Sequence, residues 1–321
     1  MTWIFDIQQP VTGTAAVGTY RLKAALIARG WTVPSSSDGT TYNSSGDQIS
    51  SGAAGANGLG NANAWFRIKC PVGTREFVFQ RISAAAWRIK YSVAGFTAGS
   101  PSATRVPSAT DEVVIIGGGT DAAPTGFTWG SVDATAQKWN VITGDATEGY
   151  SFTVHAHAPG SFTMVMGLTF DLMEQANASD LDPYAILYGT SAFAYAYSGM
   201  QSGDAAANGN GGRFWYKYDV AGITRVWVAS TADHPSPSIA STTLGPNPFN
   251  GKDEIVPVIY WRSLVPTQGF KGISRIFKQG TVFRATGDGF SLNSTRDLVC
   301  VQGTSGTSMT LIPWDGSIWV P

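Results

Sequence analysis

Charged residues are scarce in this sequence, since Asp, Glu, Lys and Arg make up only 13% of its 321 residues. That is about half the share found in an ordinary globular protein. Glycine is abundant, with 38 residues, and the formal net charge is −1. A surface with few charges and many small residues is typical of chains whose neighbours cover part of it. We therefore expect the protein to form a homo-oligomer.

Cysteine is nearly absent as well, with Cys70 and Cys300 as the only two. Each lies in an apolar or extended run, which is typical of buried thiols, and we predict that both are buried. A disulfide between them, which would close a very long loop, stays open as an alternative.

Long apolar runs are missing too. No stretch reaches the roughly 18 apolar residues that a membrane-spanning helix needs, so we expect no membrane segment. The N-terminus, MTWIFDIQQP, has no basic stretch followed by an apolar one, so we expect no signal peptide.

Alternation of apolar and polar residues is the main pattern that the sequence does contain. Many short runs alternate in this way, as antiparallel strands with one buried face do. One stretch, 19–29, has helical spacing and is followed by Gly30 as the expected end of the helix. The predicted fold class is mainly β: an antiparallel β-sandwich, jelly-roll-like, with one N-terminal helix and long glycine-rich loops.

The predicted domain organisation has one boundary. Residues 1–63 would form an N-terminal strand, the helix and a glycine- and serine-rich assembly segment, and residues 64–321 the β-sandwich. Within the sandwich we predict a short helix over 171–178, an edge strand at Pro257 and a hairpin turn at Asp315-Gly316. The strands predicted after residue 92 are 113–119, 138–143, 150–158, 162–170, 213–219, 223–229, 254–261, 282–286, 297–302 and 309–320.

The segment 64–92 is strongly basic, although the chain as a whole is nearly neutral. It holds six bases and the single acid Glu76, which leaves 15 bases against 21 acids in the rest of the chain. Apolar and aromatic residues alternate with polar ones along its three runs, which predicts a three-stranded antiparallel meander with an aromatic face and a basic face. The bases are Arg67, Lys69, Arg75, Arg81, Arg88 and Lys90.

This basic face is the main candidate interface. Because the remainder of the chain is acidic, we expect the face to point outward and to dock on an acidic neighbouring subunit. Nucleic acid is a weaker candidate partner, since most aromatic rings that would stack on bases lie on the opposite face. Trp215, which stands between two bases, is a further residue expected at a surface. The interface hypothesis therefore comprises Arg67, Lys69, Arg88, Lys90 and Trp215.

His155 and His157 are the sharpest candidates for a metal site, because residues i and i+2 of a strand face the same side. A catalytic zinc ion needs a third protein ligand, and the one remaining histidine, His234, lies far along the chain. We therefore predict no metal site and no cofactor. The glycines 117–119 lack the lysine and the following helix of a phosphate-binding loop.

Catalytic motifs are absent, and we predict no enzymatic activity. No G-x-S-x-G elbow occurs, and Asp180 and Asp182 fit a loop better than a calcium site. Two alternatives stay open. The paired carboxylates of a glycan-cleaving enzyme meet in space and not in sequence. Exposed aromatic rings such as those of Trp215 and Trp227 could also bind a host-surface glycan.

Both ends of the chain contain segments in a familiar order. A helix is followed by GWTV, DGTTYN, a glycine-rich loop, AWFRI, REFVFQR and WRIKYS, and KGISRIFKQG, TRDLVCV and LIPWDGS come near the C-terminus. In this order the segments resemble structural proteins of tailed bacteriophages, of the kind found with tail, neck and baseplate genes. The resemblance implies a non-enzymatic virion component, made in the host cytoplasm, whose partners are other virion proteins and copies of itself.

Overall fold

The computed structural model describes part of the chain in detail: residues 4–5, 11–13, 15–37, 42–43, 64–83, 86–97, 106–129, 137–157, 164–175, 182–190, 213–220, 223–230, 255–262, 269–280, 289–292, 296–302 and 309–314. Beyond residue 186 it describes the backbone alone, except at Gly272 and Arg275.

The chain divides into two compact units. Unit 2 comprises Val11–Trp139 and Ala206–Gly209, and unit 1 comprises Met1–Pro10, Asn140–Ala205 and Asn210–Pro321. The boundary between them falls inside one strand, after Trp139. The domain boundary expected at residue 63 stays a prediction.

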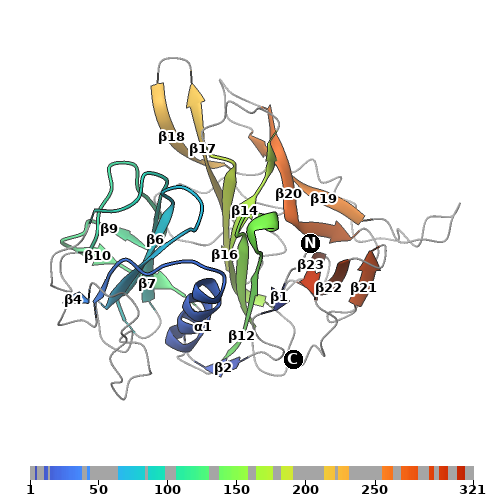
Figure 1. The fold of residues 1–321 in the computed structure, drawn as a ribbon, viewed down its shortest axis with the longest axis horizontal. Helices are drawn as coiled ribbons and strands as arrows, with labels where there is room; N and C mark the ends of the chain where they lie inside the picture. Colours follow the sequence, from blue (N-terminus) through green and yellow to red (C-terminus); the bar gives the residue numbers. More distant parts are fainter. Residues whose placement is uncertain are drawn as a thin grey trace, which may run out of the picture. The chain divides into compact units, whose positions relative to one another are not determined.

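Unit 2 is built on the predicted meander. Its sheet has the strand order β11-β7-β6-β5-β3-β4, with β8 also paired to β7. Figure 1 labels β4, β6 and β7 of this sheet. Neighbouring strands in the centre follow one another in sequence and are antiparallel, as expected for short turns. The strands are β3 (Ser36–Ser37), β4 (Tyr42–Asn43), β5 (Trp65–Lys69), β6 (Glu76–Arg81), β7 (Ala86–Ser92), β8 (Val113–Ile116) and β11 (Phe127–Thr128), and the separate hairpin β9 (Gly118–Gly119) and β10 (Pro124–Thr125) follows β8.

The predicted helix is present, but it begins earlier than the apolar spacing indicates. Helix α1 spans Ala15–Ala28. It ends in a Schellman motif, because Trp31 N donates to the Leu26 carbonyl and Gly30 N donates to the Ile27 carbonyl. Gly30 has φ +88°, a conformation that glycine adopts without steric cost. The expected C-terminal role of Gly30 is therefore confirmed.

Helix α1 packs on the aromatic face of the meander. Its buried face consists largely of small or polar residues. Of the larger apolar residues in the predicted stretch 19–29, Leu22 and Leu26 are buried, whereas Tyr20 and Ile27 are partly exposed. The ammonium group of Lys23 lies 5.4 Å from the centre of the Phe66 ring.

Two tryptophans complete this contact. Trp129 Nε1 donates a hydrogen bond of 2.9 Å to Thr19 Oγ1, which in turn donates to the Ala15 carbonyl at 2.7 Å. The Trp139 ring lies against the backbone of the helix at Gly18. Tight contact of this kind needs a residue without a side chain.

Unit 1 is built from antiparallel sheets. In one sheet the order is β1-β12-β13-β14-β16-β17-β18, and in the other β15-β20-β23-β22-β21, with β19 also paired to β20. Strand β2 (Val11–Gly13), which belongs to unit 2, pairs with Gln137–Trp139 of β12. The remaining strands are β1 (Ile4–Phe5), β12 (Gln137–Thr143), β13 (Phe152–His157), β14 (Met164–Leu172), β15 (Glu174–Gln175), β16 (Tyr184–Thr190), β17 (Arg213–Val220), β18 (Ile223–Ser230), β19 (Ile255–Arg262), β20 (Gly269–Gly280), β21 (Gly289–Leu292), β22 (Arg296–Gln302) and β23 (Met309–Trp314).

Side-chain contacts stabilise the first sheet of unit 1, and one hydrogen bond links it to the second sheet. Phe170 stacks on Tyr184 with ring centres 4.2 Å apart, and the Tyr184 hydroxyl donates to the Gly149 carbonyl at 2.7 Å in the turn after the 3₁₀ helix η1 (Ala146–Glu148). From the second sheet, Arg275 N donates to Asp171 Oδ1 at 3.3 Å. The predicted mainly β fold of antiparallel sheets, with one N-terminal helix, is confirmed.

Several local predictions differ from the structure. The helix predicted over 171–178 is wrong in its described part, because the chain continues as β14 and β15. Strands β16 and β20 were not predicted, since neither has a simple alternation. Pro257 lies on β19, which pairs only with β20 among the described strands, as an edge position requires. The predicted strand 282–286 and the turn at Asp315-Gly316 lie outside the described residues.

Replacement of Gly18 by alanine tests the contact between helix and tryptophan. A Cβ atom there would lie 2.0 Å from Cδ2 of Trp139, so we expect Gly18→Ala to lower the free energy of unfolding by about 1–3 kcal/mol. Without that contact, the change would raise it by about 0.5–1 kcal/mol through helix propensity. Urea denaturation of the two proteins gives the sign, and a stabilised variant would contradict the packing described here.

Candidate functional site

The strand register of the meander sorts its side chains into two faces. Gln80 is paired with Arg88, and Val78 with both Arg67 and Lys90, so these residues share one face. The apolar and aromatic residues between them share the other face, against α1. The predicted separation of a basic from an aromatic face is therefore confirmed.

The basic face is covered by the chain itself, contrary to the sequence-based expectation. Three stretches, 92–97, 106–112 and 120–121, which we call the covering segment, lie over it, whereas β8 between them pairs with β7 in the sheet. Phe96 and Val106 form one buried cluster with Trp65 and Val78 from the sheet. The meander is thus a central layer, with α1 on one side and the covering segment on the other.

Burial of the bases follows from this cover. The exposed fraction is 8% for Arg67, 2% for Arg88 and 0% for Lys90, whereas Lys69 is partly exposed. The expectation of an outward-facing basic surface is therefore corrected for the three buried residues. Burying a charge without a partner is costly, so each of them needs acidic or carbonyl groups nearby.

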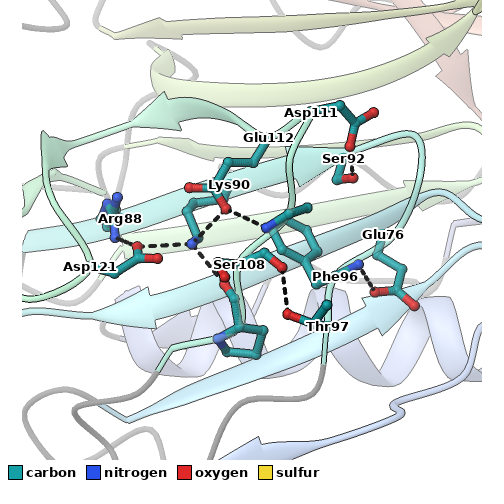
Figure 2. Close-up of polar contacts among 12 residues, drawn as sticks. Glu76, Arg88, Lys90, Ser92, Phe96, Thr97, Ser108, Asp111, Glu112 and Asp121 are labelled. Carbon is teal, nitrogen blue, oxygen red and sulfur yellow. Dashed lines mark hydrogen bonds and ion pairs between the residues drawn. The ribbon is translucent and has the colours of Figure 1, made fainter.

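Lys90 lies at the centre of this arrangement (Figure 2). Its Nζ donates to the Pro107 carbonyl at 2.7 Å, to Glu112 Oε2 at 2.9 Å and to Asp121 Oδ1 at 2.9 Å. These are the three hydrogen bonds that an ammonium group can donate. The Phe96 ring centre lies 5.4 Å from the same nitrogen. Three protein oxygens, two of them from carboxylates, therefore surround the charge of Lys90.

Arg88 shares one acid with Lys90. Its Nη1 donates to Asp121 Oδ1 at 2.5 Å, and its Nη2 donates to the Gly119 carbonyl at 3.2 Å. Asp121 stands in the turn between β9 and β10, where Gly117 and Gly119 have φ +85° and +73°. The glycine run that superficially resembles a phosphate loop thus forms the tight hairpin that carries Asp121 to the two bases.

Burial and the two bases act on Asp121 in opposite directions. Partial burial raises the pKa of its carboxyl group, but hydrogen bonds from Lys90 and Arg88 and the charges of both bases outweigh that effect. The pKa therefore lies below its usual value of 3.8. Asp121 is ionised at neutral pH.

Two other acids link the covering segment to the meander. Glu76, the single acid of the basic block, accepts from Arg67 Nε at 3.1 Å and Nη2 at 3.0 Å, and also from the backbone N of Phe96 at 2.8 Å. Asp111 accepts a hydrogen bond from the Ser92 hydroxyl and from the backbone N of Val93 at 3.2 Å. Carboxylates therefore hold the covering segment at several separate points.

The remaining sequence candidates are not gathered at this site. His155 is buried on β13, and the side chain of His157 lies outside the described part. No group of three potential metal ligands occurs among the side chains that the structure describes. Trp215 lies on β17 between β16 and β18, again without a described side chain. Asp180 lies outside the described residues, and Asp182 is buried.

Cys70 is a buried thiol, 1% exposed, as predicted, whereas the side chain of Cys300 is not described. Within the described residues, no helix is both long and apolar enough to span a membrane.

The sequence matches no known family model and no curated protein. The roles of the residues above therefore follow from their own contacts.

Charge reversal at the buried bases tests the corrected assignment. Arg88→Glu with Lys90→Glu would place additional acids against Glu112 and Asp121, so we expect a loss of stability of about 3–5 kcal/mol or failure to fold. Lys69→Gln is the control on the same face, and this change at a partly exposed position should alter stability by only about 0.5 kcal/mol. Thermal melts and denaturant titrations compare the variants. Equal, small effects of both changes would show that the bases are solvated after all.

Proposed function

We propose that the protein is a non-enzymatic structural component of a tailed-phage particle, in its tail, neck or baseplate. It would act by packing against copies of itself and against other virion proteins. The order of segments at both ends of the chain supports this proposal, and so does the mainly β architecture. The proposed location is the virion, after synthesis in the host cytoplasm.

The observation that carries the proposal is the internal use of the charged cluster. Arg67, Arg88 and Lys90 are the strongest candidates for a binding or reacting site in the sequence, yet each is buried against acids of the same unit. Such pairs fix one arrangement of three layers, and a unit with one fixed arrangement suits repeated, identical contacts in an assembly.

Sheet edges are the surfaces through which such a building block would contact its neighbours. Strand β18 (Ile223–Ser230) pairs only with β17 among the described strands, and its sequence, ITRVWVAS, contains neither proline nor an acid. A long edge without these features presents backbone groups to which another chain can add a strand. We therefore expect β18 to lie at a subunit contact.

Cross-linking and mass spectrometry of intact tailed particles test the proposal. We expect the chain in purified particles in several copies, with cross-links between copies and to other virion proteins. The soluble fraction of the same lysate is the control for carry-over. A chain found only in that fraction, and never in washed particles, would contradict the structural role.

A further inference from the structure

Lys90 of the meander and Glu112 and Asp121 of the covering segment meet in one compact group. One amine lies 2.9 Å from an oxygen of each of two carboxyl groups, and its own side chain is only 1% exposed. A salt bridge needs one acid, whereas the formation of an amide needs an amine, an acyl group and a second acid that accepts a proton. We propose that Lys90 Nζ and Asp121 Cγ become joined by an intramolecular amide bond, with Glu112 as the proton acceptor.

The surroundings of Lys90 favour its use as a nucleophile. The residue is 0% exposed, and its nitrogen is enclosed by the Pro107 carbonyl, the two carboxyl groups and the Phe96 ring. The side chain of Asp121, which supplies the acyl carbon, is 33% exposed, so the attack takes place at the edge of this enclosure. Proteins that use lysine in covalent chemistry commonly bury its amine and hold it close to the group that it attacks.

Glu112 and Asp121 differ in ways that assign their roles. Among the described bases, Glu112 accepts a hydrogen bond from Lys90 alone. It accepts one more from the Ala109 backbone, so it is placed to take a proton from Nζ. Asp121 is also held by Arg88 Nη1. That guanidinium group can stabilise negative charge that develops on the Asp121 oxygen when Nζ attacks Cγ.

The reaction balances without a further reagent. Glu112 takes one proton from the ammonium group, and the nitrogen lone pair then forms the bond to Cγ. The bond from Cγ to one oxygen breaks, and that oxygen leaves as water with the two hydrogens that the nitrogen has lost. A positive ammonium and a negative carboxylate thus give a neutral amide and one water molecule, with no oxidation or reduction.

The ion pair itself opposes this step, because the two bases hold Asp121 in its ionised form. The reaction must therefore pass through the less populated neutral pair, which makes it slow. The fixed position of the two groups offsets part of this barrier, since the effective molarity of well-oriented groups within one molecule reaches about 10⁵–10⁸ M. We accordingly expect the bond to accumulate in the folded protein over time and not in the unfolded chain.

Intact-mass measurement of the purified, folded chain tests the inference directly. We expect a mass lower than that of the sequence by one water molecule. Trypsin would then fail to cut after Lys90, and the digest would contain residues 89–105 linked to residues 106–138, since no lysine or arginine lies within 106–137. A folded protein that keeps the full mass after long incubation, and is cut after Lys90, would overturn the proposal.

Variants separate this chemistry from a structural role. Lys90→Arg keeps the charge and Glu112→Gln keeps the size of the side chain, and both should remain at full mass while near-ultraviolet circular dichroism shows a folded protein. Glu174→Gln, which makes the same change at a largely exposed acid of unit 1, is the matched control and should still lose water. A linked Glu112→Gln protein would overturn the role of Glu112. The inference does not depend on the virion proposal, because none of these measurements involves a particle.

Discussion

The desolvation of Lys90 is the constraint on which the arrangement of unit 2 depends. Its ammonium group has no exposed surface, so three oxygens from the covering segment must replace its water. Those oxygens come from Pro107, Glu112 and Asp121, which stand on either side of β8. Placing them fixes the position of the covering segment on the sheet, and the apolar contacts of Phe96 and Val106 with Trp65 and Val78 then close the space between.

The meander itself was predictable from the sequence, because alternation of period two is a local property that follows from strand geometry. The helix was predictable in its position and in its end at Gly30. Its buried face was less so, since Gly18, Thr19 and Lys23 pack against Trp139, Trp129 and Phe66 and carry no apolar signal of their own. In these places tertiary contact decides burial, and residue type alone does not.

Which face of the meander lies inward could not be predicted from the block 64–92 alone. The acids that neutralise Arg88 and Lys90 are Glu112 and Asp121, which look like ordinary turn residues in the sequence. One signal was available: both acids follow within about one loop length of the bases, and short connections usually join elements that are neighbours in space. Comparing charges across adjacent segments would have favoured an internal pairing over a partner subunit.

Asp121 serves two bases at once, and this sharing has an evolutionary consequence. A change at Lys90 alone leaves Glu112 without its base, and a change at Asp121 alone leaves Arg88 and Lys90 with an excess of positive charge. Substitutions at these positions are therefore tolerated mainly in combination. In descendants of this sequence, substitutions at positions 88, 90, 112 and 121 should be correlated. Lys69, on the same face but partly exposed, should vary independently of them.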